Sequence, residues 1–265
     1  MSQLRTPLAV YRILPGTNCG RCFLPSCLAF SAAVIRGDKR LEDCPPLQES
    51  GGAGQVADVR PKVRETELQE QISLLQARVS SLDLPLVAAR VGGEWCNGRL
   101  RLQVLGKMYE VGPDGRVTSA CHTHPGLVIP LLHYILEGRE GELTGDWVAF
   151  RELKDGAAMN ALFVQRGEAP LKQLADSQPE FFGDLVSIFS GRRADAHLDA
   201  EISLVLYPLP KLPVMICYWP PEDDLDSKLT LLFDSSADRR LGIRPIYSLA
   251  VGLAMMFEKI ARRHL

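Results

Sequence analysis

The sequence predicts an α+β protein in which a small cysteine-rich N-terminal module precedes an α+β domain with a mainly antiparallel sheet and flanking helices. Four of the seven cysteines lie in the first fifth of the chain. A glycine-rich stretch, residues 48–55, then interrupts the hydrophobic pattern, and several apolar, β-branched segments follow it. With 265 residues, 46% hydrophobic and 23% charged, the chain is long enough for both parts.

The most informative feature is a run of cysteines with the spacing C-x2-C-x4-C-x16-C, formed by Cys19, Cys22, Cys27 and Cys44. The close pair lets two thiolates from one tight turn reach adjacent corners of a metal centre, and Gly20 lets the backbone bend around inorganic sulfide. Cys44 precedes two prolines, which fix the turn without competing N–H groups. Four thiolates at this spacing predict one 4Fe-4S cluster as the cofactor.

Zinc, a disulfide pair and ordinary buried cysteines are the alternatives. Structural zinc usually takes its ligands as two close pairs, whereas here one close pair is followed by two single cysteines. Residues 1–12 contain no continuous apolar segment and no small-residue cleavage site that would direct export to an oxidising compartment. We therefore expect reduced thiols and a cytoplasmic location.

The composition shift divides the chain into three parts. We expect an iron–sulfur cluster module in residues 1–48, a flexible linker in residues 49–64 and the α+β domain in residues 65–265. Helical periodicity predicts helices over residues 28–36 (ending at Gly37), 66–82, 126–137, 156–165, 180–189 and 246–260.

Three details of these helices can be tested. Thr66 and Gln69 have the spacing of a capping box, which predicts a helix start at Thr66. Pro130 predicts a kink or a late start of its helix. Arg262 and Arg263 are placed to interact with the C-terminal dipole of the last helix.

Strand signals fall in two groups. Residues 99–105 and 107–111 alternate polar and apolar side chains before a Gly-Pro-Asp-Gly turn, which predicts a half-exposed sheet. Residues 201–207, 213–219 and 228–233 are apolar and β-branched, and they predict a central antiparallel meander.

The cysteine-rich segment resembles a known module. Residues 14–30 and 41–47 are similar to the four-iron, four-sulfur domain of the corrinoid iron–sulfur protein large subunit. The resemblance implies that all four cysteines bind the cluster and that the cluster supplies low-potential electrons to a protein partner or a corrinoid. Phe23 departs from the family pattern, which usually has glycine there, and no corrinoid-binding barrel is recognisable downstream.

The larger part also has a family resemblance. Residues 147–153, 209–214, 218–220 and 232–236 resemble an uncharacterised domain, domain of unknown function 3786, over most of residues 65–265. The resemblance implies no activity, so it transfers no catalytic residue. Asp234 to Ser236 could bind a polar ligand, but we expect a strand-ending turn or a helix cap there.

Other candidate side chains carry weaker signals. Cys121, His122 and His124 could ligate a metal or a cofactor, but we favour a polar loop before Pro125 that explains the histidines without a ligand, with Cys121 as a small apolar filler. We expect Cys96 and Cys217 to be buried structural thiols and His133 to be a hydrogen-bonded core side chain. The acidic residues 222–226 could dock a basic electron donor or be a solvated loop.

Charge and length exclude other classes. A net charge of −2 without a recognition motif predicts no nucleic-acid partner. The most apolar stretch, residues 246–257, has about 12 residues where a membrane span needs about 20, so no membrane insertion is predicted. No Ser-His-Asp triad can be argued from spacing.

Two main functional hypotheses follow. The first is an iron–sulfur redox protein, a low-potential electron carrier or accessory subunit for an anaerobic metalloenzyme or corrinoid system, with a redox protein partner. The alternative is an enzyme or chaperone whose larger domain binds a second cofactor, a corrinoid or haem, that the cluster reduces. A scaffold with a structural cluster is a third. Whether the larger domain binds a small molecule or catalyses a reaction stays open.

Overall fold

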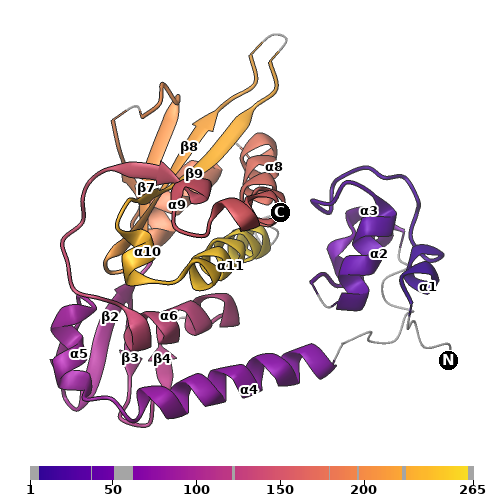
Figure 1. The fold of residues 1–265 in the computed structure, drawn as a ribbon. Helices are drawn as coiled ribbons and strands as arrows, with labels where there is room; N and C mark the ends of the chain where they lie inside the picture. The colour runs from indigo at the N-terminus through magenta and orange to yellow at the C-terminus, as the bar shows by residue number, and fades with distance from the viewer. Residues whose placement is uncertain are drawn as a thin grey trace. The chain divides into compact units, whose positions relative to one another are not determined.

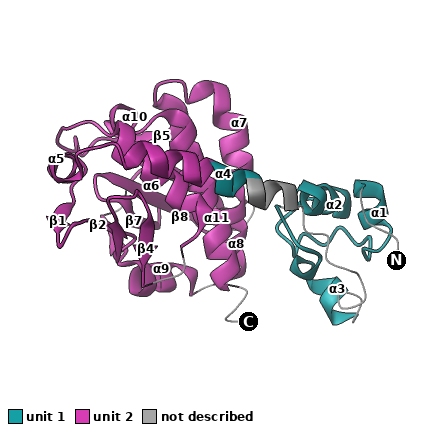
Figure 2. Cartoon of the chain, turned by 90° about the horizontal axis from the view of Figure 1, so that it is seen from below, with its two compact units in different colours: residues 1–70 teal, residues 71–265 magenta. Residues whose placement is uncertain are grey.

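The computed structural model describes residues 6–36, 38–50, 62–120, 123–178, 180–195, 197–222 and 225–261. The chain divides into two compact units, residues 1–70 and 71–265, which Figure 2 shows in different colours. Much of the predicted linker, residues 49–64, lies outside the described residues, so the predicted domain limits remain predictions.

The first unit is a small helical module around the cysteines. Its elements are α1 (Pro7–Tyr11), α2 (Cys27–Arg36), the 3-10 turn η1 (Leu41–Asp43) and α3 (Pro45–Glu49). The apolar core contains Val10, Phe30, Val34, Leu41 and Leu47 together with three of the cysteines. The predicted helix over residues 28–36 is confirmed and begins one residue earlier. Its predicted end, Gly37, lies outside the described residues.

Two helices precede the first sheet, α4 (Lys62–Val79) and α5 (Leu84–Arg90). The helical periodicity predicted for residues 66–82 is confirmed within α4, because Ile72, Leu75 and Val79 are buried. The predicted capping box is wrong, since the helix begins at Lys62 and Thr66 lies inside it. Residues 62–65 extend the helix in front of Thr66, and a local capping motif does not prevent such an extension.

The second unit contains two antiparallel sheets, and Figure 1 shows their strands. The first sheet has the order β1-β2-β3-β4, with strands Glu94–Cys96, Arg99–Val104, Lys107–Val111 and Val117–Ser119. Alternate residues of β2, Leu100, Leu102 and Val104, are buried, as the sequence pattern predicts for a half-exposed sheet.

The second sheet contains the predicted meander. Its order is β5-β9-β8-β7-β6, with strands Trp147–Ala149 (β5), Arg192–Arg193 (β6), Ile202–Leu209 (β7), Leu212–Trp219 (β8) and Lys228–Asp234 (β9). The three central strands are those that the sequence predicts, and the short edge strands β5 and β6 are additions. The α+β fold class with mainly antiparallel pairing is therefore confirmed.

The helices that follow the first sheet pack around the second sheet and against one another (Figure 1). They are α6 (Pro125–Glu137), α7 (Asn160–Phe163), α8 (Ala169–Ser177), α9 (Phe181–Phe189), α10 (Ala237–Arg240) and α11 (Ile243–Ala261), with short 3-10 turns at Phe150–Glu152 and Ala157–Met159. Aromatic rings join the layers, because Phe163 contacts Phe233 of β9 and Phe182 contacts Tyr218 of β8.

Three helix predictions need correction or qualification. The predicted helix over 156–165 is wrong in extent, because it passes through a π-helical turn (Val164–Glu168) into α8, which the pattern missed. Helix α6 starts at Pro125 and continues through Pro130, so the late start is wrong. Residues 262–263, which the sequence predicts to interact with the C-terminal dipole of the last helix, lie outside the described residues. Helices 180–189 and 246–260 are confirmed as α9 and α11.

Within the described residues, no single helix has the length and apolar character needed to cross a membrane. The bent pair Glu67–Val79 and Leu84–Arg90 meets that requirement jointly, by length and composition only.

Candidate metal centre

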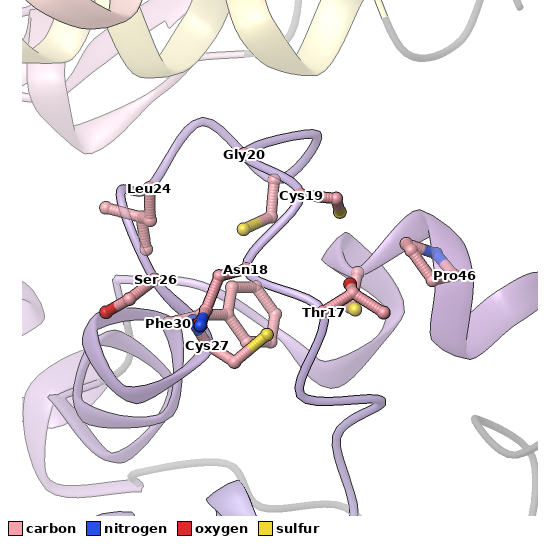
Figure 3. Close-up of a pocket in the computed structure, with 11 residues that line it drawn as sticks. Thr17, Asn18, Cys19, Gly20, Leu24, Ser26, Cys27, Phe30 and Pro46 are labelled. Atoms are coloured by element: carbon pink, nitrogen blue, oxygen red, sulfur yellow. Dashed lines mark hydrogen bonds between the residues drawn. The ribbon is translucent and has the colours of Figure 1, made fainter.

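Four cysteines of the first unit line one pocket. They are Cys19 and Cys22 in the loop before α2, Cys27 at the start of α2, and Cys44 directly before α3. Figure 3 shows Cys19 and Cys27 on this pocket, with the ring of Phe30 beside Cys27. The other lining residues are Thr17, Asn18, Gly20, Leu24, Ser26, Phe30 and Pro46. The structure thus brings together the four cysteines that the spacing singled out.

The loop that carries Cys19 and Cys22 turns sharply. Gly16, Asn18, Gly20 and Phe23 have positive φ angles between 50° and 71°. The Phe23 N–H donates to the Gly20 carbonyl at 2.7 Å and closes one of these turns. Glycine adopts this left-handed conformation without strain, whereas a bulky residue does not. The conformation explains physically why glycine would suit position 23.

Asn18 fastens this loop to α2. Its Oδ1 accepts a hydrogen bond from the Cys27 N–H at 2.7 Å, and the Ser26 hydroxyl accepts one from the Ala29 N–H at 3.1 Å. Both contacts satisfy donors at the helix N-terminus. Cys27 is consequently held as the first residue of a ten-residue helix.

Cys44 sits at the entry of α3. Pro45 and Pro46 occupy the first two helical positions, where a missing N–H is tolerated. Burial raises the pKa of the Cys44 thiol, and the Leu47 N–H, the first donor after the prolines, opposes that rise. The Leu47 N–H therefore acts on this sulfur directly after the two prolines, which have no N–H.

The four thiols differ in exposure. Cys19 is exposed, whereas the other three are between 5% and 7% exposed: Cys22, Cys27 and Cys44. Burial raises the pKa of Cys22, and the Leu24 N–H acts in the opposite direction but does not cancel that rise. The backbone N–H of Arg21 lowers the pKa of Cys19. One side of the pocket therefore faces solvent through Cys19.

This donor set fits an iron–sulfur cluster. A cubane takes each of four thiolates on a different iron, so its ligands surround a pocket rather than a point. Backbone N–H groups act on three of the sulfurs, and such donors tune and stabilise clusters. In the described parts of the chain, no group of three or more His, Cys, Asp or Glu side chains is arranged to hold a metal ion. The fit rests on the shared pocket and its donors.

Two cations lie near the pocket. Arg21 forms a two-pronged ion pair with Glu49 at the end of α3, with Nη2–Oε1 and Nη1–Oε2 distances of 2.5 and 3.2 Å. Lys39 places its Nζ 5.6 Å from the centroid of the Phe23 ring. The sequence reasoning missed Lys39 and Asn18. An asparagine beside two glycines and a cysteine was the available signal, because asparagine tolerates the left-handed region and bonds nearby backbone.

The histidine candidates of the second unit are only partly described. His124 is the N-cap of α6, and its Nδ1 accepts from the Gly126 N–H at 3.1 Å. Cys121 and His122 lie outside the described residues, so their roles stay open. The predicted hydrogen bond of His133 is confirmed, to Glu137 at 3.1 Å, but the side chain is half-buried and not a core residue.

The remaining thiols of the second unit differ from each other. Cys217 is fully buried, as expected. The expectation of a buried Cys96 is wrong: this residue is half-buried on the edge strand β1, where Arg101 donates to its sulfur at 3.6 Å. An edge strand lacks one neighbouring strand to cover its side chains. Residues 223–224 of the predicted acidic loop lie outside the described residues, and docking there remains a prediction.

Asp234 is a buried carboxylate that accepts several hydrogen bonds within the fold, and it is not an open ligand site. It is 1% exposed and accepts hydrogen bonds from the N–H groups of Thr144, Gly145 and Ser236 and from the hydroxyls of Thr144 and Ser236. The expected strand-ending turn is confirmed as an Asx turn, in which the Ser236 N–H donates to Asp234, and it ties residues 144–146 to the end of β9. A helix-capping role is not seen, because the N-cap of α10, Ser236, makes no side-chain cap hydrogen bond.

Comparison with known families agrees with both resemblances found in the sequence. The family described as "Domain of unknown function (DUF3786)" matches residues 83–256. This match covers more than half of the chain, which therefore belongs to that family. A second family, described as "Putative Fe-S cluster", matches residues 14–46 and supports an iron–sulfur cofactor in the cysteine-rich unit.

Curated relatives match short stretches. The acetyl-CoA decarbonylase/synthase complex subunit gamma 1 of Methanosarcina thermophila is 32% identical over 94 residues, which are 35% of this chain and 18% of that protein. The gamma subunit of Methanothermobacter thermautotrophicus is 50% identical over 42 residues, 16% of this chain and 9% of that protein. The corrinoid/iron-sulfur protein large subunit of Moorella thermoacetica is 33% identical over 63 residues, 24% and 14% respectively. This chain spans less than a fifth of each relative, and no solved structure matches it.

Proposed function

We propose that Cys19, Cys22, Cys27 and Cys44 hold one 4Fe-4S cluster and that the protein is a low-potential electron carrier or accessory subunit of an anaerobic metalloenzyme or corrinoid system. One observation carries the proposal: the four cysteines of the 14–46 family match line the same pocket. A bound cluster would supply one-electron storage and transfer.

The residues around the pocket suit that role. Phe30 and Leu24 form an apolar wall that keeps water from part of the site, and Phe30 is only 1% exposed. Low polarity disfavours the extra negative charge of a reduced cluster and favours a low potential, whereas nearby N–H donors raise it. The balance of these two effects sets the potential within the range of such clusters.

Electron exchange needs a short path to the surface. Cys19 is the exposed thiol of the four, so we place the exchange surface around Cys19. The neighbouring Arg21–Glu49 ion pair is exposed at the same end of the module and would form part of a partner contact. Exposed ion pairs contribute to orientation and association rate more than to affinity.

A redox protein partner is part of the proposal. Relatives that share the cysteine-rich stretch are named as subunits of a decarbonylase/synthase complex or as a corrinoid/iron-sulfur subunit, and these names support assembly with another protein. A reducing compartment such as the cytoplasm belongs to the same proposal, because four of the six described cysteines would bind the cluster as thiolates. We place the cluster module in residues 1–48, the linker in 49–64 and the α+β domain in 65–265.

The deciding experiment is spectroscopy of the anaerobically purified full chain before and after dithionite. We expect a broad absorption shoulder near ~400 nm that bleaches on reduction, with about four iron and four sulfide per chain. A colourless protein that holds stoichiometric zinc would overturn the proposal. Additional sharp bands would instead indicate a second chromophore in the larger unit.

Matched serine variants test the ligands. Cys22→Ser should lose or convert the cluster, because it removes one thiolate from the pocket. Cys217→Ser, which changes a buried thiol of the second unit, should keep full iron and sulfide. Circular dichroism of both variants checks that the second unit stays folded. Full iron and sulfide in Cys22→Ser would rule out that ligand assignment.

A further inference from the structure

Phe23 has an unusual backbone for its residue type. It follows Cys22 directly and has a φ of 61°. A bulky side chain is rarely found in this left-handed region. Such strain persists only where the surrounding structure holds it, and it concentrates at functional sites. Neighbouring residues must therefore hold the Phe23 ring in place.

The ring lies against a lysine. Lys39 Nζ is 5.6 Å from the ring centroid, within the distance for a cation–π contact. The backbone of Lys39 is also fixed, because its N–H donates to the Ala33 carbonyl at 3.3 Å near the end of α2. On the other side, the Phe23 N–H bonds the Gly20 carbonyl. The strained turn at Phe23 and the end of α2 together therefore position the ammonium group of Lys39.

The charge of this ammonium reaches the ligand pocket. Phe23 follows Cys22 directly, so the ammonium that lies against the Phe23 ring is close to the Cys22 side of the pocket. Cys22 is only 7% exposed, so solvent and salt screen this interaction less than one at the surface.

We propose that Phe23 and Lys39 form a positioning pair that fixes a positive charge beside the Cys22 corner of the cluster and raises its reduction potential. The inference rests on the proposed function, because it requires a cluster in this pocket. Reduction adds one electron to the cluster and forms or breaks no bond. A fixed cation therefore stabilises the reduced form more than the oxidised form. Lys39 acts through its charge, and Phe23 acts by holding Lys39.

The test is an anaerobic redox titration with dithionite, followed by electron paramagnetic resonance. Lys39→Gln removes the charge at similar side-chain length, and Lys39→Arg keeps it. We expect the ratio of reduced to oxidised cluster at a fixed potential to fall at least threefold in Lys39→Gln, about 28 mV at 59 mV per tenfold. Lys39→Arg should stay near wild type. Arg40→Gln is the control, since it removes a charge from an exposed neighbour in the same segment.

Phe23→Leu tests the positioning role. It removes the aromatic face and keeps the ammonium, so we expect a smaller shift in the same direction. In the double variant Phe23→Leu/Lys39→Gln, the shift in reduction potential should equal that of Lys39→Gln alone, because without the lysine there is no charge for the aromatic ring to position. Where Lys39→Gln fails to retain its cluster, Phe23→Leu decides: a potential equal to wild type would then overturn the inference.

The outcomes separate this inference from the proposed function. A wild-type protein without iron and sulfide contradicts the proposed function itself. A full cluster whose potential in Lys39→Gln equals that in Arg40→Gln contradicts only the role of Lys39. A shift in Lys39→Gln with no shift in Phe23→Leu would keep Lys39 as a tuning charge and reject Phe23 as its support.

Discussion

The side-chain oxygen of Asn18 accepts a 2.7 Å hydrogen bond from the backbone N–H of Cys27. This contact joins the loop that carries Cys19 to the first turn of α2. It also satisfies one of the backbone donors that every helix N-terminus leaves unpaired. A single side chain thereby sets the distance between two of the proposed ligands.

Replacing Asn18 with glycine should loosen the site. Glycine accepts the positive φ of this position and removes only the hydrogen-bond acceptor. We expect a loss of about 0.5–1.5 kcal/mol in the stability of the module, the range for one lost hydrogen bond. Iron release to a chelator should accelerate accordingly. Asn97→Gly, at a position of similar φ in the second unit, should leave iron release unchanged, and equal rates in both variants would contradict the role of Asn18.

In cluster-free protein, Cys19 should be alkylated by iodoacetamide before Cys22 and Cys44. Cys19 is exposed and the Arg21 N–H lowers its pKa, whereas burial raises the pKa of the other two thiols. The thiolate is the reacting form, so both effects favour Cys19. Peptide mass spectrometry after short reaction times at neutral pH measures the order. Cys217, buried and with a raised pKa, should react only in denaturant. Equal labelling of all these thiols would contradict the asymmetry of the pocket.

Asp234→Asn should destabilise the second unit in a pH-dependent way. Burial alone would raise the pKa of Asp234, but hydrogen bonds from Ser236, Gly145 and Thr144 lower it below its ordinary value. A lowered folded-state pKa means that the ionised form stabilises the fold above the unfolded value of about 3.9, and that this contribution is lost as the pH falls through the folded value. At pH 7 we expect a loss of about 1–3 kcal/mol.

Denaturant unfolding from pH 7 to acid checks this prediction. The difference between wild type and Asp234→Asn should shrink below a pH of about 4. Asp238→Asn provides a control, because Asp238 accepts one exposed hydrogen bond from the Lys154 N–H. A pH-independent difference would show that the charge of Asp234 contributes nothing.

Gly252→Ala should destabilise the packing of α11 against α6. A Cβ at Gly252 would lie 2.5 Å from the Gly126 carbonyl oxygen, so the two helix backbones would have to separate. We expect a loss of about 1–3 kcal/mol, as for other overpacked sites. Gly183→Ala, in α9 with open space around the new methyl, should be neutral or stabilising. Thermal unfolding of both variants measures the contrast, and an unchanged midpoint in Gly252→Ala would contradict the close contact.

Local sequence patterns predicted the elements that have a long, continuous apolar or periodic signal. Strands β7, β8 and β9 consist mainly of apolar residues, and α11 repeats its buried positions over 19 residues. Helix α8 was missed because its stripe is short. It is stabilised by packing on α11 and β9 and follows a π-helical turn whose Glu168 bonds the Leu231 N–H, 63 residues away.

The sequence by itself determined the α+β class, the central meander and the four cysteines that suit a cluster, because hydrophobic period and ligand spacing are properties of adjacent residues. The tertiary structure decided which thiol is exposed, that Asn18 caps Cys27 and that Lys39 lies over a strained Phe23. Burial and hydrogen-bond partners depend on how separate segments pack together. Those contacts fix the solvent access and the local charge of the pocket, and neither can be read from spacing along the chain.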